Sequence, residues 1–286
     1  MKLKPYIQLM RPRHYLKNFL VFLPLVFGGF LFTEKYLLRA VYSFIAFSMV
    51  ASTVYIINDL KDKDYDLKHS KKDKRPIAAG LVSTRSAIIQ AVLLIAIAGV
   101  FQGLAGFKLT SVGLLLGYLV INVAYSFGLK NLPIIDVSII SLGFVLRVLY
   151  GGYSVGIEIS KWLYLAILAF SFYLGLGKRR NEIKTNGSET RKVNRHYNQD
   201  FLDKNMYVCF GLTIVYYSLW AIDPAQQHKR MVLTIPLVLI IAMLYSLAVE
   251  SSSSDGDPIS VLLGNKPLLI LTGIYILMAT YIVYVS

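Results

Sequence analysis

Long apolar runs separated by shorter polar segments dominate this chain of 286 residues. An α-helix needs about 20 predominantly apolar residues to cross the hydrocarbon core of a bilayer. On that criterion we expect nine membrane spans, at about 17–33, 37–58, 84–104, 109–127, 132–156, 162–177, 206–222, 231–249 and 267–285. The pattern therefore predicts an all-α fold, a polytopic membrane helical bundle of nine transmembrane helices.

Composition supports the membrane class. Hydrophobic residues make up 56% of the chain, charged residues only 16%, and the mean hydropathy is +0.56. A soluble globular protein of this size would need more charge to cover its surface. We expect one transmembrane domain over residues 1–286, with two long cytoplasmic loops at about 59–83 and 178–205.

The basic residues fall mainly on one side of the predicted spans. With nine spans, 23 of the 30 Lys and Arg residues lie on the face that holds the N-terminus, and six lie on the opposite face. The positive-inside rule makes the first face cytoplasmic. We therefore expect a multi-pass plasma-membrane protein with a cytoplasmic N-terminus. The net charge of +14 then reflects topology, and we expect no nucleic-acid partner.

Four acidic residues cluster where the second span ends, within the segment 58–66. On a helix, Asn58, Asp62 and Asp66 are spaced four residues apart and share one face, and Asp59 lies beside them. Oxygen ligands one turn apart suit Mg²⁺, which usually takes one or two carboxylates together with substrate phosphates. The alternative is a solvated helix end, with the acids interleaved with lysines.

Basic residues surround this motif in the expected cytoplasmic face. Arg75 is a candidate bidentate phosphate donor and Lys72 a candidate point charge, although the same segment can attract anionic lipid. Arg147 stands inside the fifth span, where a charged residue indicates a functional site unless it pairs with an acid such as Asp136. Other polar residues converge on the same face: Lys17, Asn18, Lys130, Lys178, Arg179 and Glu182. Together they favour a substrate with several phosphates.

The acidic segment resembles the hallmark of UbiA-type membrane transferases, Asn-Asp-x-x-Asp-x-x-x-Asp after the second helix. In this chain it is formed by Asn58, Asp59, Asp62 and Asp66, followed by His69 and by Arg75-Pro76. The resemblance implies nine spans and an active site at the cytoplasmic face. Most members of this superfamily transfer a prenyl group and carry a second Asp-rich motif after the sixth helix.

The chain departs from that pattern after its sixth predicted span, where Lys178-Arg179-Arg180-Asn181-Glu182 is basic with a single acid. In this it is similar to the branch typified by decaprenyl-phosphate phosphoribosyltransferase. Further segments match that branch in order: Arg11-Pro12-Arg13, Lys17-Asn18, Tyr125-Ser126, Leu129-Lys130, Ile135-Asp136, Gly143 to Arg147, and Gly151-Gly152.

This resemblance implies that 5-phosphoribose passes from phosphoribosyl pyrophosphate to a polyprenyl phosphate, such as decaprenyl phosphate, in cell-wall biogenesis. It implies Mg²⁺ as cofactor, metal ligation by Asn58, Asp62 and Asp66, and catalytic roles for Asp59, Asp62 and Asp66. The resemblance also implies substrate contacts from Lys17, Asn18, Tyr55, His69, Lys72, Arg75, Lys130, Asp136, Arg147, Lys178, Arg179 and Glu182.

Two other functions stay open at this point. An aromatic prenyltransferase would share the fold and the metal, but would be expected to carry a second Asp pair after the sixth span. A secondary transporter or lipid-phosphate carrier would line its pathway with Arg147 and the acids, but its site would lie near the membrane midplane. The sequence leaves open whether the chain forms a homo-oligomer.

Overall fold

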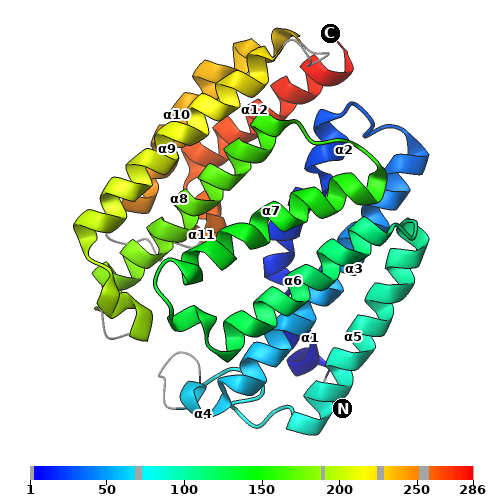
Figure 1. Ribbon diagram of the computed structural model, residues 1–286, viewed down its shortest axis with the longest axis vertical. Helices are drawn as coiled ribbons and strands as arrows, with labels where there is room; N and C mark the ends of the chain where they lie inside the picture. The colour runs from blue at the N-terminus through cyan, green and yellow to red at the C-terminus, as the bar shows by residue number, and fades with distance from the viewer. Residues whose placement is uncertain (1–2, 68–72, 188–190, 224–228, 251–257, 286) are drawn as a thin grey trace. The chain divides into compact units, whose positions relative to one another are not determined.

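The computed structural model describes residues 3–67, 73–187, 191–223, 229–250 and 258–285 (Figure 1). Every regular element in these ranges is a helix, which confirms the all-α prediction. The elements are α1 (Lys4–Met10), η1 (Pro12–Phe22), α2 (Leu23–Phe27), α3 (Glu34–Lys61), α4 (Lys63–Asp66), α5 (Thr84–Ala105), α6 (Leu109–Phe127), η2 (Leu129–Asn131), α7 (Ile135–Val155), α8 (Lys161–Asn186), η4 (Lys192–His196), α9 (Gln199–Ile222), η5 (Lys229–Thr234), α10 (Ile235–Glu250), α11 (Pro258–Gly264) and α12 (Lys266–Tyr284).

Seven helices in the described part of the chain are long and apolar enough to cross a membrane. They are α3, α5, α6, α7, α9, the segment Arg230–Glu250 that includes α10, and α12. The count of nine spans is therefore not confirmed. The first expected span is formed by the 3₁₀ helix η1 and the short α2, and the sixth lies in α8, whose second half is charged.

Helix α8 also changes the predicted loop boundaries. It continues to Asn186, so the segment expected to be a loop from residue 178 begins as helix. The helix ends at Gly187, which has a φ of +76° and donates its N–H to the Ile183 carbonyl. Glycine adopts positive φ without the steric cost that a Cβ brings. The charged residues 178–184 are consequently held on a helical surface.

The chain forms two compact units, which share α7. Unit 1 comprises residues 1–25, 30–130 and 146–158, and unit 2 comprises residues 26–29, 131–145 and 159–286. The single transmembrane domain over residues 1–286 stays a prediction.

The core of unit 1 is the packing of α3 against α5. The buried face of α3 is rich in small residues, among them Ala40, Ser43, Ala46 and Ala51, and α5 contributes buried Ala87, Ala91 and Ala98. Small side chains let membrane helices approach closely. The hydroxyl of Thr53 bonds back to the Met49 carbonyl of its own helix, so this polar group is satisfied inside the core. The packing fixes the C-terminal end of α3, which carries the acidic motif.

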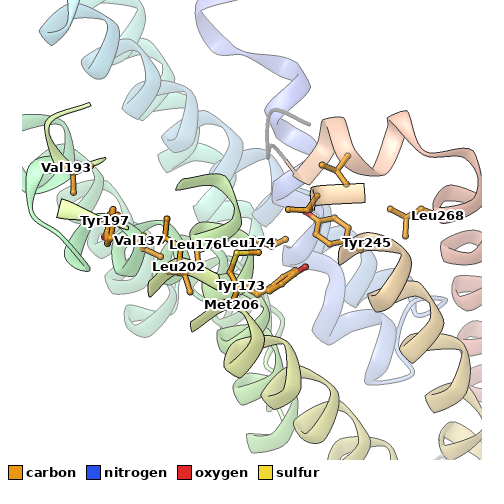
Figure 2. Close-up of a cluster of buried hydrophobic side chains, with 12 residues drawn as sticks. Val137, Tyr173, Leu174, Leu176, Val193, Tyr197, Leu202, Met206, Tyr245 and Leu268 are labelled. Carbon is orange, nitrogen blue, oxygen red and sulfur yellow. The ribbon is translucent and has the colours of Figure 1, made fainter. Parts of the chain in front are cut away.

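The core of unit 2 gathers side chains from α7, α8, α9, α10 and α12 (Figure 2). Its members include Val137, Tyr173, Leu174, Leu176, Val193, Tyr197, Leu202, Met206, Tyr245 and Leu268. Gly175 lets α8 approach α7, because a Cβ at this position would lie 2.8 Å from Cγ1 of Val137. This close contact sets the course of α8 into its charged C-terminal half.

Candidate functional site

The acidic motif lies where α3 turns into α4 in unit 1. Asp59 and Asp66 are buried, with 3% and 1% of their surface exposed, and Asp62 is half-buried between the two helices. The backbone N–H of Asp62 donates to the Asn58 carbonyl at 2.9 Å, and that of Asp66 donates to the Asp62 carbonyl at 2.8 Å. The winding therefore remains close to helical, as the four-residue spacing predicted.

Asp59 and Asp66 share one guanidinium. Nη1 of Arg75 donates to Oδ1 of Asp59 at 3.0 Å and to Oδ2 of Asp66 at 2.7 Å. Nη2 of Arg11 donates to the same Oδ1 of Asp59 at 2.5 Å. Two guanidiniums thus converge on one buried carboxylate oxygen, and charge-assisted bonds of this kind are among the stronger ones in proteins.

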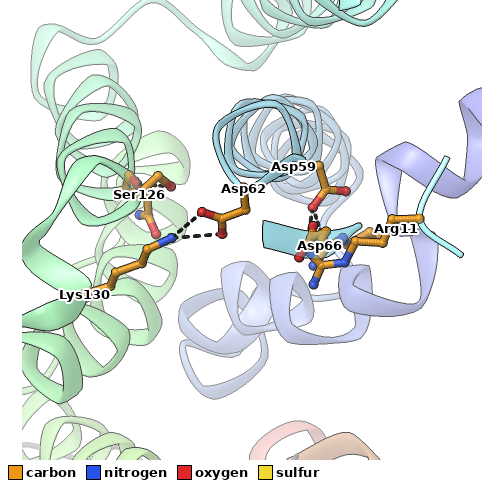
Figure 3. Close-up of polar contacts among 8 residues, drawn as sticks. Arg11, Asp59, Asp62, Asp66, Ser126 and Lys130 are labelled. Atoms are coloured by element: carbon orange, nitrogen blue, oxygen red, sulfur yellow. Dashed lines mark hydrogen bonds and ion pairs between the residues drawn. The ribbon is translucent and has the colours of Figure 1, made fainter. Parts of the chain in front are cut away.

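Asp62 faces a different cation. Nζ of Lys130 donates to both carboxylate oxygens of Asp62, at 2.6 and 2.9 Å. Figure 3 shows Asp62 directed toward Lys130, whereas Asp59 is directed toward Arg11. The structure thus brings the predicted site residues Asp59, Asp62, Asp66, Arg75 and Lys130 into two neighbouring ion-paired groups of unit 1.

Arg11 belongs to a segment that matches the phosphoribosyltransferase branch, but no role was predicted for it, and the structure places it at the site. Its backbone is left-handed, with φ 52° and ψ 60°, at the junction of α1 and η1. Its Cζ lies 4.9 Å from the centroid of the Tyr55 ring, close enough for a cation–π contact. The predicted donor-side residue Tyr55 is therefore in contact with Arg11.

Arg147 is buried in unit 1, with 5% of its surface exposed. Its Nε donates to Oδ1 of Asn18 at 2.8 Å, and its Nη2 donates to the Tyr118 hydroxyl at 3.1 Å. Its Cζ lies 5.1 Å from the ring centroids of both Phe47 and Tyr118. Asn18 in turn donates to Ser48, so the side chain predicted to bind substrate also orients the arginine.

Asp136 and Arg179 form an ion pair in unit 2, so the predicted alternative partner of Arg147 is engaged elsewhere. Nε of Arg179 donates to Oδ2 of Asp136, and Nη1 of Arg179 donates to Oε2 of Glu182, each at 2.6 Å. Arg191 approaches the same Glu182 oxygen at 3.3 Å. Burial alone would raise the pKa of Glu182, but Arg179 and then Arg191 outweigh it and hold that pKa below its usual value.

Tyr197 completes this network, and the sequence reasoning missed it. Its hydroxyl donates to Oδ1 of Asp136 at 2.6 Å and accepts the N–H of Ile134 at 2.6 Å. Ile134 has a φ of 67°, which is rare for a β-branched residue. Burial and the neighbouring Asp136 raise the pKa of Tyr197, so the hydroxyl keeps its proton and remains a donor. An uncharged residue in a polar loop carries no sequence signal for this role.

The predicted site residues are distributed as follows. Unit 1 holds Lys17, Asn18, Tyr55, Asn58, Asp59, Asp62, Asp66, Arg75, Lys130 and Arg147, and unit 2 holds Asp136, Lys178, Arg179 and Glu182. His69 and Lys72 lie outside the described residues. The substrate, metal and catalytic roles expected of all these residues stay predictions.

The donor set of the motif suits a hard divalent cation. Within the described ranges, no group of three or more His, Cys, Asp and Glu side chains is arranged to hold a metal ion. Asn58, Asp62 and Asp66 nevertheless offer oxygen atoms only, which is what Mg²⁺ prefers. Oδ1 of Asp66 is buried and accepts no hydrogen bond from any described residue. A buried carboxylate oxygen in this state fits a position for a cation ligand.

The helical fold and the apolar spans are those of a multi-pass membrane protein. The model of the UbiA prenyltransferase family matches residues 21–257, and the chain belongs to that family.

Among curated relatives, the decaprenyl-phosphate phosphoribosyltransferase of Corynebacterium glutamicum is 30% identical over 98% of this chain and 86% of its own length. The enzyme of the same name from Mycobacterium tuberculosis is 33% identical over 76% of this chain and 74% of its own.

Solved structures of the family share the fold. A UbiA homolog from Archaeoglobus fulgidus bound to GPP and Mg²⁺ has a TM-score of 0.74 at 20% identity, over 98% of this chain and 99% of that one. A digeranylgeranylglyceryl phosphate synthase structure has a TM-score of 0.65 at 18% identity, over 99% and 98%. The A. fulgidus homolog has also been solved with Cd²⁺, so divalent metal binding occurs among proteins of this fold.

Proposed function

We propose that the protein transfers 5-phosphoribose from phosphoribosyl pyrophosphate to a polyprenyl phosphate such as decaprenyl phosphate, with release of pyrophosphate. The observation that carries the proposal is the C-terminal half of α8. Where a prenyltransferase is expected to present a second acidic motif, Arg179 is buried against Asp136 and Glu182. The names of the relatives that align over most of the chain support the same reaction.

The chemistry requires stabilisation of the leaving group more than a strong base. The bond from the anomeric carbon of ribose to the pyrophosphate oxygen breaks, and a bond from that carbon to an oxygen of the lipid phosphate forms. The attacking phosphate oxygen is already ionised near neutral pH. Cationic side chains placed where negative charge develops on the departing pyrophosphate lower the barrier.

The residues of unit 1 supply these functions. When bound, Mg²⁺ neutralises charge on the pyrophosphate as a Lewis acid, and Asn58, Asp62 and Asp66 would hold it. Arg75 and Lys130 already lie at the carboxylates, each about a quarter exposed, and would contact donor phosphates together with Lys17, Tyr55 and Lys72. Arg147 would bind the lipid phosphate or the 5-phosphate of the donor. Lys178 of unit 2 is a second candidate for either role.

The protein would work in the plasma membrane, with its N-terminus and its site on the cytoplasmic side, where phosphoribosyl pyrophosphate is available. Of the alternatives, a transporter loses support because the chain belongs to a prenyltransferase family. The experiment must therefore distinguish the proposed function from that of an aromatic prenyltransferase.

The test is transfer of radiolabel in detergent with Mg²⁺. Label from ribose-labelled phosphoribosyl pyrophosphate is expected to enter the organic phase only when a polyprenyl phosphate is added. A parallel reaction offers a labelled prenyl diphosphate and 4-hydroxybenzoate, and no prenylated product is expected. Label that stays in the water phase with lipids of several chain lengths contradicts the proposal, and prenylation of the aromatic acid supports the alternative.

A further inference from the structure

We propose that Arg11 is a further donor-binding residue, and that Arg11 and Arg75 together form a paired-guanidinium site for a phosphate group of the donor diphosphate. In this arrangement Asp59 is a positioning residue beneath the two arginines. The inference rests on the proposed function, because it assigns residues to the diphosphate of that donor.

The geometry separates a buried anchor from two accessible cations. Nη2 of Arg11 and Nη1 of Arg75 contact the same oxygen of Asp59, at 2.5 and 3.0 Å. The Asp59 side chain is 3% exposed, whereas those of Arg11 and Arg75 are 22% and 25% exposed. Each guanidinium carries five N–H donors in a planar fork that matches phosphate oxygens. Oδ1 of Asp59 therefore holds two guanidinium groups, both of which remain partly exposed to solvent.

The backbone and the ring of Tyr55 fix the direction of Arg11. The residue has φ 52° and ψ 60°, and its N–H caps α1 by donating to the Gln8 carbonyl at 3.1 Å. Left-handed backbone is common at the end of a helix but is strained at a non-glycine residue, and such strain clusters at functional sites. The guanidinium also lies over Tyr55, so its orientation is set on two sides before any ligand arrives.

A purely structural explanation would be that the Arg11–Asp59 ion pair fixes the N-terminal arm, residues 4–13, against α3. Other contacts also hold this arm in place. Ser52 donates to the Met10 carbonyl at 3.0 Å, Gln90 donates to the Tyr6 carbonyl at 2.9 Å, and Leu9 is fully buried. These contacts do not involve the Arg11 side chain, so we expect the arm to stay in place when that side chain is replaced.

The experiment measures binding of inorganic pyrophosphate to the full chain in detergent by calorimetry, at saturating Mg²⁺. Arg11→Ala is expected to weaken pyrophosphate binding by about tenfold or more, the range for losing a hydrogen bond to a charged group. Arg11→Lys keeps the charge but loses the fork and is expected to bind more weakly than the native protein. Arg13→Ala, an exposed arginine on the same arm, is the matched control and should bind as the native protein does.

The role of Asp59 is tested by a double-mutant cycle with Asp59→Asn. If Asp59 acts through the arginines, Asp59→Asn weakens pyrophosphate binding in the native protein and has a smaller effect in Arg11→Ala. Native affinity in both Arg11 variants, with only a lower unfolding temperature, overturns the proposal and leaves the ion pair structural. If the native protein transfers phosphoribose while the Arg11 variants bind pyrophosphate normally, this inference alone fails. If the native protein neither binds pyrophosphate nor transfers label, the proposed function fails with it.

Discussion

Arg179 and Asp136 form an ion pair of 2.6 Å in which both side chains are completely buried. The pair joins the beginning of α7 to the charged half of α8, inside unit 2. A buried ion pair is weak evidence for net stability, since the cost of removing two charges from water offsets their attraction. Removing only one partner is strongly destabilising, because the other charge then stays buried without an opposite charge beside it.

We therefore expect Arg179→Met to destabilise unit 2 by about 3–5 kcal/mol. The thermal unfolding temperature in detergent is the measurement. The double variant Asp136→Leu with Arg179→Met removes both charges and is expected to be more stable than the single variant. An Arg179→Met variant with the same unfolding temperature as the native protein would contradict this prediction.

Asp62→Asn is expected to lower the turnover number on the order of 10²-fold, the range for removal of one electrostatic contribution to a transition state. The reason is the loss of a carboxylate that we place at the metal and opposite Lys130. Label transfer from phosphoribosyl pyrophosphate checks this. Asp64→Asn serves as control, because Asp64 is exposed and is given no role at the site. Full activity of Asp62→Asn would support the alternative of a solvated helix end, and an equal loss in both variants would mean that the effect is not specific to Asp62.

Gly151→Ala is expected to destabilise the protein by about 1–3 kcal/mol or more, as overpacking does. A Cβ on Gly151 would lie 2.0 Å from the backbone oxygen of Val21, which no side-chain adjustment relieves. Gly117→Ala is the matched helical control, since a Cβ there meets nothing within 4 Å. The unfolding temperatures of the two variants should differ clearly, and equal values would mean that η1 moves away at little cost.

The Glu182 carboxyl predicts how stability depends on pH. Its pKa in the folded protein lies below its usual value of 4.5, so the fold favours the ionised form. The corresponding stability is present above pH 4.5 and is lost as the pH falls below that value. Unfolding temperatures between pH 7 and pH 3 measure the loss. Glu182→Gln should remove part of this dependence, and a pH profile identical to that of the native protein would argue against the Glu182 carboxylate as its source.

The sequence predicted the near-helical winding of the acidic motif because its spacing is local, with Asn58, Asp62 and Asp66 on successive turns. It did not predict that Asp62 would pair with Lys130 while Asp66 shares Arg75 with Asp59. Arg11 and Tyr197 were missed because each meets its carboxylate through a contact of long sequence separation, 48 residues for Asp59 and 61 for Asp136. The charged end of α8 was predicted to be a loop because its residues are too polar to lie in the membrane. It is helical because Lys, Arg and Glu are good helix formers, whatever their polarity.

The 3₁₀ winding of η1 keeps its side chains in register with those of α3. Side chains three residues apart are aligned on a 3₁₀ helix, and three steps of about 2.0 Å advance about 6 Å. Four steps of about 1.5 Å on an α-helix advance the same 6 Å. Tyr15 and Asn18 accordingly bond to Ser52 and Ser48, two rungs of one antiparallel ladder. Rewinding η1 as an α-helix would put these rungs out of step and turn Tyr15 or Asn18 away from its serine.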